Sequence, residues 1–165
     1  MAREFKSLDA FATFLRGRGA TAERAAQRAL KREAQAVADS AKAMLGEYQT
    51  GEGPFPDWKQ LADATQAERA KAGFAPNDPL RRTGDLAASI SSAADGNRAV
   101  TGSTSPYAAA QELGTKNIPP RPFLGLAAHR RSKTVAANVA NAAVAALAAT
   151  NRAKKRVPQP GGDDE

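Results

Sequence analysis

Clusters of proline and glycine confine long helices to two parts of this chain. The segments 50–56 and 73–79 cannot continue a helix, because proline lacks an amide donor and glycine favours open conformations. Three prolines lie between 119 and 122, and they force an extended backbone there. Long helices are therefore expected only before residue 50 and after residue 122.

The first of these parts is predicted to hold two helices. Ser7 can cap a short helix, which Gly17 and Gly19 are expected to end. Thr21 can then cap a longer helix that extends to Tyr48, because alanine, leucine and valine recur there at helical spacing.

Two further helices are predicted in the rest of the chain. Thr65 and Glu68 have the spacing of a capping box, which favours a short helix over 66–72. The alanine-rich segment from Leu124 to about Thr150 is predicted to form the last long helix.

A β-hairpin is predicted between these helices. The segments 86–94 and 98–103 flank Asp95-Gly96, a pair that favours a tight turn between antiparallel strands. One helical turn capped at Thr83 precedes the first strand, and a helix over 107–113 stops at Gly114. The expected fold is α+β, with a small antiparallel β-sheet packed against long α-helices in a single domain over 1–150. Residues 151–165 are expected to be a disordered basic tail, because their composition buries little apolar surface.

The chain contains no cysteine, and its composition predicts that it gains stability by forming oligomers. Its 165 residues suffice for one domain, and the absence of cysteine excludes disulfides and thiolate metal sites. Only 5% of the residues are aromatic, so an alanine-rich core removes little surface from water and oligomerisation is expected. The charged N-terminal segment and the lack of a long apolar run favour a soluble protein with no membrane partner.

Residues that could support catalysis do not form a recognisable constellation. His129 is the single histidine, so it cannot complete a metal site or serve a serine triad whose spacing is also missing. No glycine-rich phosphate-binding loop is present. The sequence therefore predicts no enzyme, no cofactor, no metal and no small-molecule substrate.

Positive charge is concentrated in the second half of the chain. From Gly96 to Gly162 there are ten lysines and arginines and one acidic residue, Glu112. The candidate basic face comprises Arg130, Arg131, Lys133, Arg152, Lys154, Lys155 and Arg156. It can face DNA without reading its sequence, face an acidic protein, or be an ordinary solvated surface. The first of these leaves open an alternative function as a nucleic-acid-binding accessory protein without sequence specificity.

Four short motifs, in order, resemble a known family. They are Pro79-Leu-Arg-Arg-Thr-Gly-Asp-Leu-Ala-Ala-Ser-Ile90, Val100-Thr-Gly-Ser103, Tyr107-Ala-Ala-Ala-Gln-Glu-Leu-Gly-Thr115 and Pro119-Pro-Arg-Pro-Phe-Leu124, preceded by a tryptophan segment at Trp58. Together they resemble the tail-completion and virion-morphogenesis proteins of tailed bacteriophages, also called minor tail, neck or head-tail joining proteins. Leu113 departs from the aromatic residue that the family pattern has before the glycine.

This resemblance implies a structural virion protein, assembled in the bacterial cytoplasm. It implies a ring, with six subunits expected, at the tail top or neck around the DNA channel. The implied partners are further copies of the chain, neighbouring neck or tail ring proteins and passing DNA. The candidate fold or interface residues are Trp58, Thr83, Gly84, Leu86, Tyr107, Glu112, Gly114, Arg121, Pro122 and Phe123. For the aromatic residues Trp58, Tyr107 and Phe123, packing in the core and contact between subunits are both possible roles.

Overall fold

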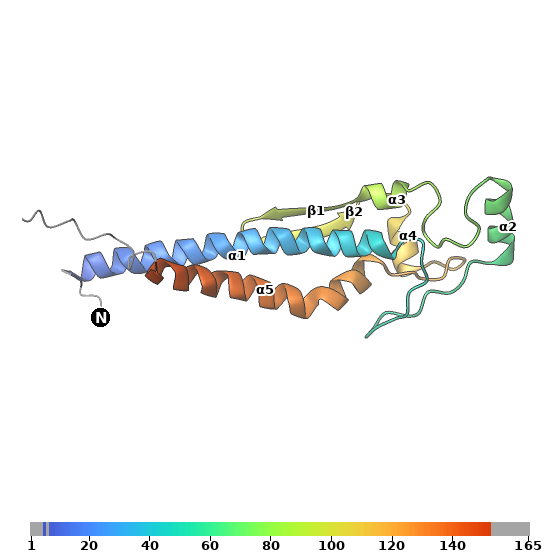
Figure 1. Cartoon of the computed structure of the whole chain (residues 1–165). Helices are drawn as coiled ribbons and strands as arrows, with labels where there is room; N and C mark the ends of the chain where they lie inside the picture. The colour runs from blue at the N-terminus through green and yellow to red at the C-terminus, as the bar shows by residue number, and fades with distance from the viewer. Residues whose placement is uncertain (1–4, 6, 153–165) are drawn as a thin grey trace, which may run out of the picture.

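Two long antiparallel helices form the frame of the molecule (Figure 1). The computed structural model describes residues 5 and 7–152. The elements in chain order are α1 (Leu8–Met44), α2 (Asp63–Lys71), α3 (Asp85–Ser89), β1 (Ile90–Asp95), β2 (Arg98–Ser103), α4 (Ala108–Leu113) and α5 (Leu124–Arg152). Long helices with a two-stranded antiparallel sheet confirm the predicted α+β class.

Helix α1 is one continuous helix, so the predicted break at Gly17 and Gly19 is wrong. The cap at Ser7 is confirmed, because its side chain accepts a hydrogen bond from the Ala10 amide at 3.1 Å. Thr21 does not begin a second helix; its hydroxyl donates to the Gly17 carbonyl at 2.9 Å within α1. Glycine weakens a helix by only about 1 kcal/mol, so it does not break one that has a packing partner.

That packing partner is α5, which lies along α1 in the opposite direction (Figure 1). The side of α1 that is covered carries mainly alanine, and small side chains let the two helices approach closely. The buried alanines of α1 are Ala25, Ala29, Ala34, Ala38 and Ala41. Near the far end of the pair, the Arg18 guanidinium donates to the Leu147 carbonyl. Contacts along most of α1 therefore keep it helical through the glycines.

The predicted hairpin is confirmed, and it packs on α1. Ile90 pairs with Ser103 and Asp95 pairs with Arg98, which leaves Gly96 and Asn97 as the two-residue turn. The first strand is shorter than expected, because the segment before Ile90 belongs to the helical turn α3. Helix α1 contacts both strands, whereas α5 packs mainly along α1. Ser92 and Thr101 fasten the hairpin to α1 through hydrogen bonds to Gln35 and the Ala34 carbonyl.

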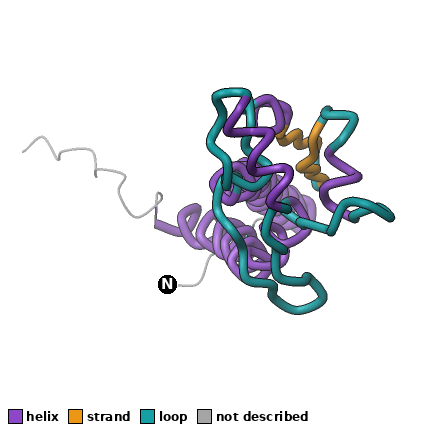
Figure 2. Tube along the Cα trace, turned by 90° about the vertical axis from the view of Figure 1, so that its right-hand side faces the viewer, coloured by secondary structure: helices purple, strands orange, loops and turns teal. Residues whose placement is uncertain are grey.

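The loops and short helices gather at one end of the helix pair (Figure 2). The large core side chains lie at this loop end. There, the end of α1 meets α3, β1 and the start of α5. The buried side chains at this end include Met44, Leu45, Trp58, Leu86, Ile90, Phe123 and Leu126. The loop end is therefore the better packed part of the molecule, although it has little regular secondary structure.

The shorter helices match the predictions only in part. The capping box is wrong, because α2 begins at Asp63 after Ala62 and no side chain caps it. Helix α4 ends at Leu113, as predicted, and α5 extends to Arg152. The tail predicted for 151–165 begins within the last turn of α5, and its residues 153–165 lie outside the described residues. No helix in the described part of the chain is long and apolar enough to cross a membrane.

Candidate functional site

The motif residues meet at the loop end, where Glu112 caps the start of α5. Its carboxylate accepts hydrogen bonds from the backbone amides of Phe123 at 2.8 Å, Leu124 at 2.9 Å and Gly125 at 2.7 Å. These amides have no partner inside the helix, and a negative charge is favoured at the positive end of the helix dipole. Glu112 therefore fixes where the last long helix starts.

Trp58 and Arg121 hold two distant loop segments together. The Trp58 indole is buried and donates to the Pro122 carbonyl at 3.2 Å. The Arg121 guanidinium donates to the Lys59 carbonyl at 2.8 Å and 3.1 Å and to the Gln60 carbonyl at 3.3 Å. The tryptophan segment is thus fastened to the proline segment, and Phe123 beside it is fully buried. Trp58 and Phe123 therefore pack in the core.

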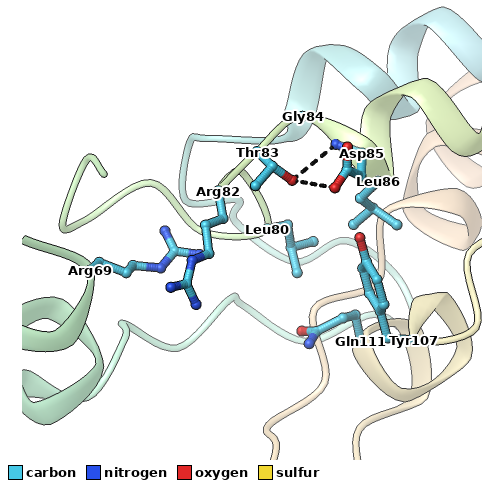
Figure 3. Close-up of a pocket in the computed structure, with 9 residues that line it drawn as sticks. All are labelled: Arg69, Leu80, Arg82, Thr83, Gly84, Asp85, Leu86, Tyr107 and Gln111. Atoms are coloured by element: carbon cyan, nitrogen blue, oxygen red, sulfur yellow. Dashed lines mark hydrogen bonds between the residues drawn. The ribbon is translucent and has the colours of Figure 1, made fainter. Parts of the chain in front are cut away.

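The Thr83-Gly84 motif begins α3. Gly84 is the residue before the helix, and the Thr83 hydroxyl donates to the Asp85 carboxylate at 2.6 Å (Figure 3). The Asp85 amide approaches the same hydroxyl at 3.5 Å, so capping by Thr83 is weak. Leu86 is buried in the core. Tyr107 is different, because 45% of it is exposed and it lines an open crevice rather than the core.

Gly114 ends α4 in a conformation that other residues rarely adopt. Its φ is 75°, and a Cβ at this position would lie 2.9 Å from the Ile118 carbonyl oxygen. The following turn is closed by the Thr115 amide, which donates to the Ile118 carbonyl at 2.8 Å. The motif from Glu112 to Thr115 therefore caps one helix and turns the chain into the proline segment.

The predicted basic face divides into residues with and without internal partners. Arg130 pairs with Glu52 at 3.3 Å and donates to the Thr50 carbonyl at 2.7 Å, which fastens the 50–56 loop to α5. Arg131 pairs with Glu33 of α1 at 3.1 Å. Lys133 is exposed. Arg152 ends α5, and Lys154, Lys155 and Arg156 lie outside the described residues. Arg130 and Arg131 therefore hold the fold together, whatever else they contact.

Glu33 is the buried acid that joins α1 to α5. It accepts hydrogen bonds from Asn138 at 2.7 Å and from Arg131 at 3.1 Å. The hydrogen bond from Asn138, followed by that from Arg131 and the Arg131 charge, holds the pKa of Glu33 below its usual value, although burial opposes this shift. Glu33 is thus ionised and paired inside the helix interface.

A second basic surface, which the sequence analysis missed, lies between α1 and β1. Its cations are Arg24, Arg28, Lys31 and Arg32, and they line two adjoining hollows of about 640 and 240 Å³ beside the hairpin. The sequence does indicate a basic helix face here, because Arg24, Arg28 and Arg32 recur at helical spacing and so project from one side of the helix. We call this surface the α1 basic groove.

Two apolar features lie far apart on the surface of the chain. Leu8, Phe11 and Leu15 form an exposed stripe at the start of α1, with exposures of 86%, 41% and 49%. A groove of about 420 Å³ lies further along α1, between it, β2 and α5. Its apolar lining consists of Leu30, Ala34, Val37, Ala99, Leu124, Ala128 and Val135. We call these features the tip stripe and the apolar groove.

The described residues contain no group of three acidic, histidine or cysteine side chains that could hold a metal ion. The His129 ring contacts the Phe55 ring, with centroids 5.8 Å apart, and therefore packs a loop against α5. The arrangement at the motif residues supports folding and contact, and it presents no assembled set of reactive groups.

Comparison with known protein families gives a match over most of the chain. The model of the phage virion morphogenesis family matches residues 8–145, which includes every described motif from α1 to most of α5. Searches of the curated proteins and of the solved structures gave no match.

Proposed function

This chain belongs to the phage virion morphogenesis family, with a structural role in virion assembly, and we propose that its copies form a ring in which one patch of each subunit contacts a different patch of the next subunit. The ring lies at the top of the tail or in the neck, with six subunits around the DNA channel. Neighbouring neck or tail ring proteins stack on it. The observation that carries this proposal is the presence of the tip stripe and the apolar groove on one subunit.

The tip stripe has the pattern of a helix that docks into a groove. Leu8, Phe11 and Leu15 are spaced three and four residues apart, so they project from one side of α1. Large apolar side chains with this degree of exposure on neighbouring turns commonly mark a contact surface. Every copy of the chain therefore carries an apolar tip stripe that can dock into the apolar groove of another copy.

A subunit cannot fill its own groove with its own stripe. Leu15 precedes Leu30 in the same continuous helix, and at 1.5 Å per residue about 22 Å of rigid helix separates them. The contact must therefore be between subunits. Because stripe and groove are different patches, the contact is heterologous, and such contacts close into rings when the rotation allows it.

Engineered cysteines test this arrangement, since the chain contains none of its own. One variant carries Leu15→Cys in the tip stripe, and a second carries Ala128→Cys at the edge of the apolar groove. Under mild oxidation, the mixture is expected to form cross-linked dimers that neither variant forms alone. A chain with both substitutions is expected to form a closed series of covalent oligomers, read by electrophoresis and by mass.

The matched control replaces Ala128→Cys with Val100→Cys. Val100 is exposed and lies between the lining residues Ala99 and Thr101, but its side chain projects from the opposite face of β2. Val100→Cys should not cross-link to Leu15→Cys. The proposed ring would be overturned if Val100→Cys cross-linked to Leu15→Cys as well as Ala128→Cys does. It would also be overturned if the protein sedimented as a monomer at every concentration.

The α1 basic groove supports a second function, contact with DNA without sequence preference. Four cations on one face neutralise phosphates and release counterions, so binding should weaken steeply with salt. Fluorescence anisotropy with a labelled duplex tests this, with Arg28→Glu and Lys31→Glu together as the variant. Lys71→Glu and Lys116→Glu together, at two exposed lysines outside both basic surfaces, are the control. Equal, salt-insensitive binding by all three proteins would contradict the proposal.

A further inference from the structure

A crevice at the loop end is lined by buried positive charge. It consists of two cavities, of about 330 and 270 Å³, that share Arg69, Leu80 and Gln111 in their walls. Arg121 lines the larger cavity. Arg82, Tyr107 and Asp85 line the smaller one, where the Asp85 carboxylate accepts a hydrogen bond from Thr83 (Figure 3). The crevice therefore lies where α2, α4 and the proline segment meet.

Arg69 and Arg121 are almost completely covered by the protein, with 7% and 5% exposure. Arg69 Nη1 donates to the Asp78 carbonyl at 2.6 Å and to the Arg81 carbonyl at 3.4 Å. Arg121 uses Nε and Nη2 on the Lys59 and Gln60 carbonyls. Within the described residues, Arg69 Nε and Nη2 and Arg121 Nη1 have no acceptor, although these atoms are not sealed from solvent. Each guanidinium thus keeps donors to offer.

No carboxylate of the described residues pairs with either guanidinium. Arg82 beside them is paired with Glu68 at 2.7 Å, so that acid is already engaged. Burial lowers the pKa of Arg121; Tyr48 opposes this shift, and the positive charge of Arg69 adds to it. Buried charges in proteins are normally paired, because an uncompensated charge away from water is costly. Both guanidinium groups line the larger cavity, which has no acidic side chain in its wall, so a carboxylate from outside the subunit can supply the negative charge.

The remaining wall of the larger cavity suits a carboxylate. It carries no acidic side chain, and the amides of Gln60, Gln111 and Asn117 can donate hydrogen bonds. Leu80, Ile118 and Pro119 provide apolar surface for an aliphatic stem. A planar guanidinium binds a carboxylate through two parallel hydrogen bonds, which makes arginine the preferred residue for this ligand.

We propose that this crevice binds an aspartate or glutamate side chain from an acidic segment of another protein. Duplex DNA is a poorer fit, because its phosphates are usually reached by side chains that extend from the protein surface. These two guanidinium groups instead lie in the wall of a crevice, which a single carboxylate side chain can enter. The site is separate from the tip stripe and the apolar groove, so it does not depend on the ring proposed above. Arg69 and Arg121 use only some of their N–H groups to hold the loops, and the other N–H groups can bind the ligand.

The test places the missing charge inside the crevice. Gln111 lines both cavities, and its side chain has no hydrogen bond to other described residues, so Gln111→Glu keeps the fold. The probes are a blocked peptide with consecutive aspartates, the same peptide with asparagines, inorganic phosphate and a short DNA duplex, all at equal ionic strength. Binding is measured by calorimetry, and stability by Tm.

The native protein is expected to bind the aspartate peptide and to gain Tm from it, with no response to the asparagine peptide. Gln111→Glu should raise Tm without any ligand and bind the aspartate peptide more than about tenfold more weakly. Asn141→Asp on the exposed side of α5 adds the same charge elsewhere and should bind as the native protein does. Equal responses to both peptides, unchanged binding by Gln111→Glu, or tighter binding of phosphate or DNA than of the aspartate peptide would overturn the proposal.

Discussion

Glu112 Oε1 accepts a hydrogen bond from the Gly125 amide at 2.7 Å, and this contact fixes the first turn of α5. The approach is close, because a Cβ on Gly125 would lie 3.0 Å from that oxygen and 2.6 Å from the Phe55 ring. A carboxylate on α4 and a glycine on α5 are therefore matched, and a change in either one affects how the helix begins.

Loss of the Glu112 carboxylate should destabilise the protein. Glu112→Ala leaves three amides without their acceptor, and we expect a loss of about 1–3 kcal/mol in the free energy of unfolding. Glu112→Gln should lose less, because one oxygen can still accept. Urea unfolding followed by the fluorescence of Trp58, the single tryptophan, measures both. Glu47→Gln, at an exposed acid, is the control and should stay within about 0.5 kcal/mol; an equal loss there would contradict the capping role.

Acid should weaken the α1–α5 interface through Glu33. Its pKa is lower in the folded protein than in the unfolded chain, so its contribution is complete above the unfolded value and is lost as pH falls through the folded value. The native protein should therefore lose more stability between about pH 5 and 3 than Glu33→Gln does. Urea midpoints across this range give the comparison, with Glu47→Gln as control. Parallel curves for the native protein and Glu33→Gln would refute the assignment.

Charge reversal should have opposite outcomes at two nearby residues of α5. Arg131→Glu places a like charge beside the buried Glu33, and we expect a loss of about 2 kcal/mol or more in stability. Lys133→Glu changes an exposed residue and should alter stability by no more than about 0.5 kcal/mol. Thermal unfolding of the two variants decides the matter. Similar Tm values would mean that the ion pair of Arg131 contributes little.

Alanine at one α1 glycine should stabilise the protein. A Cβ at Gly19 meets no atom within 4 Å, and alanine favours a helix over glycine by about 0.8–1 kcal/mol. Gly19→Ala should therefore raise Tm. Gly114→Ala is the contrasting variant and should lower it, because that residue has a φ of 75° and no room for a Cβ. A fall in Tm for Gly19→Ala would show that the glycine has a role in α1 that its surroundings do not reveal.

The elements that the sequence predicted well are those whose signals are local. The Asp95-Gly96 turn and the last helix follow from neighbouring residues, and the structure confirms both. The break at Gly17 and Gly19 was wrong, because the packing of α1 against α5 outweighs the weak preference of glycine. The capping box at Thr65 failed because Asp63 already lies in the first turn of α2.

The sites were harder to predict because their partners are distant in sequence. Glu112 was identified as part of a motif, but its contact with Gly125 requires the proline segment to fold back on α4. Arg69 was missed entirely, since one arginine on a short helix gives no local sign that it will be buried. Arg130 and Arg131 gave a strong signal of charge, yet their partners Glu52 and Glu33 lie in the first third of the chain.

The pairing of α1 with α5 also sets an order of events during synthesis. Among the described elements, α1 leaves the ribosome first, and α5, which covers its alanine-rich side, leaves last. Until residues 124–152 emerge, that side of α1 remains uncovered, and contacts between such distant segments form slowly. A nascent chain halted after residue 122 should therefore be bound by chaperones or digested by protease, and release of the remaining helix should protect it.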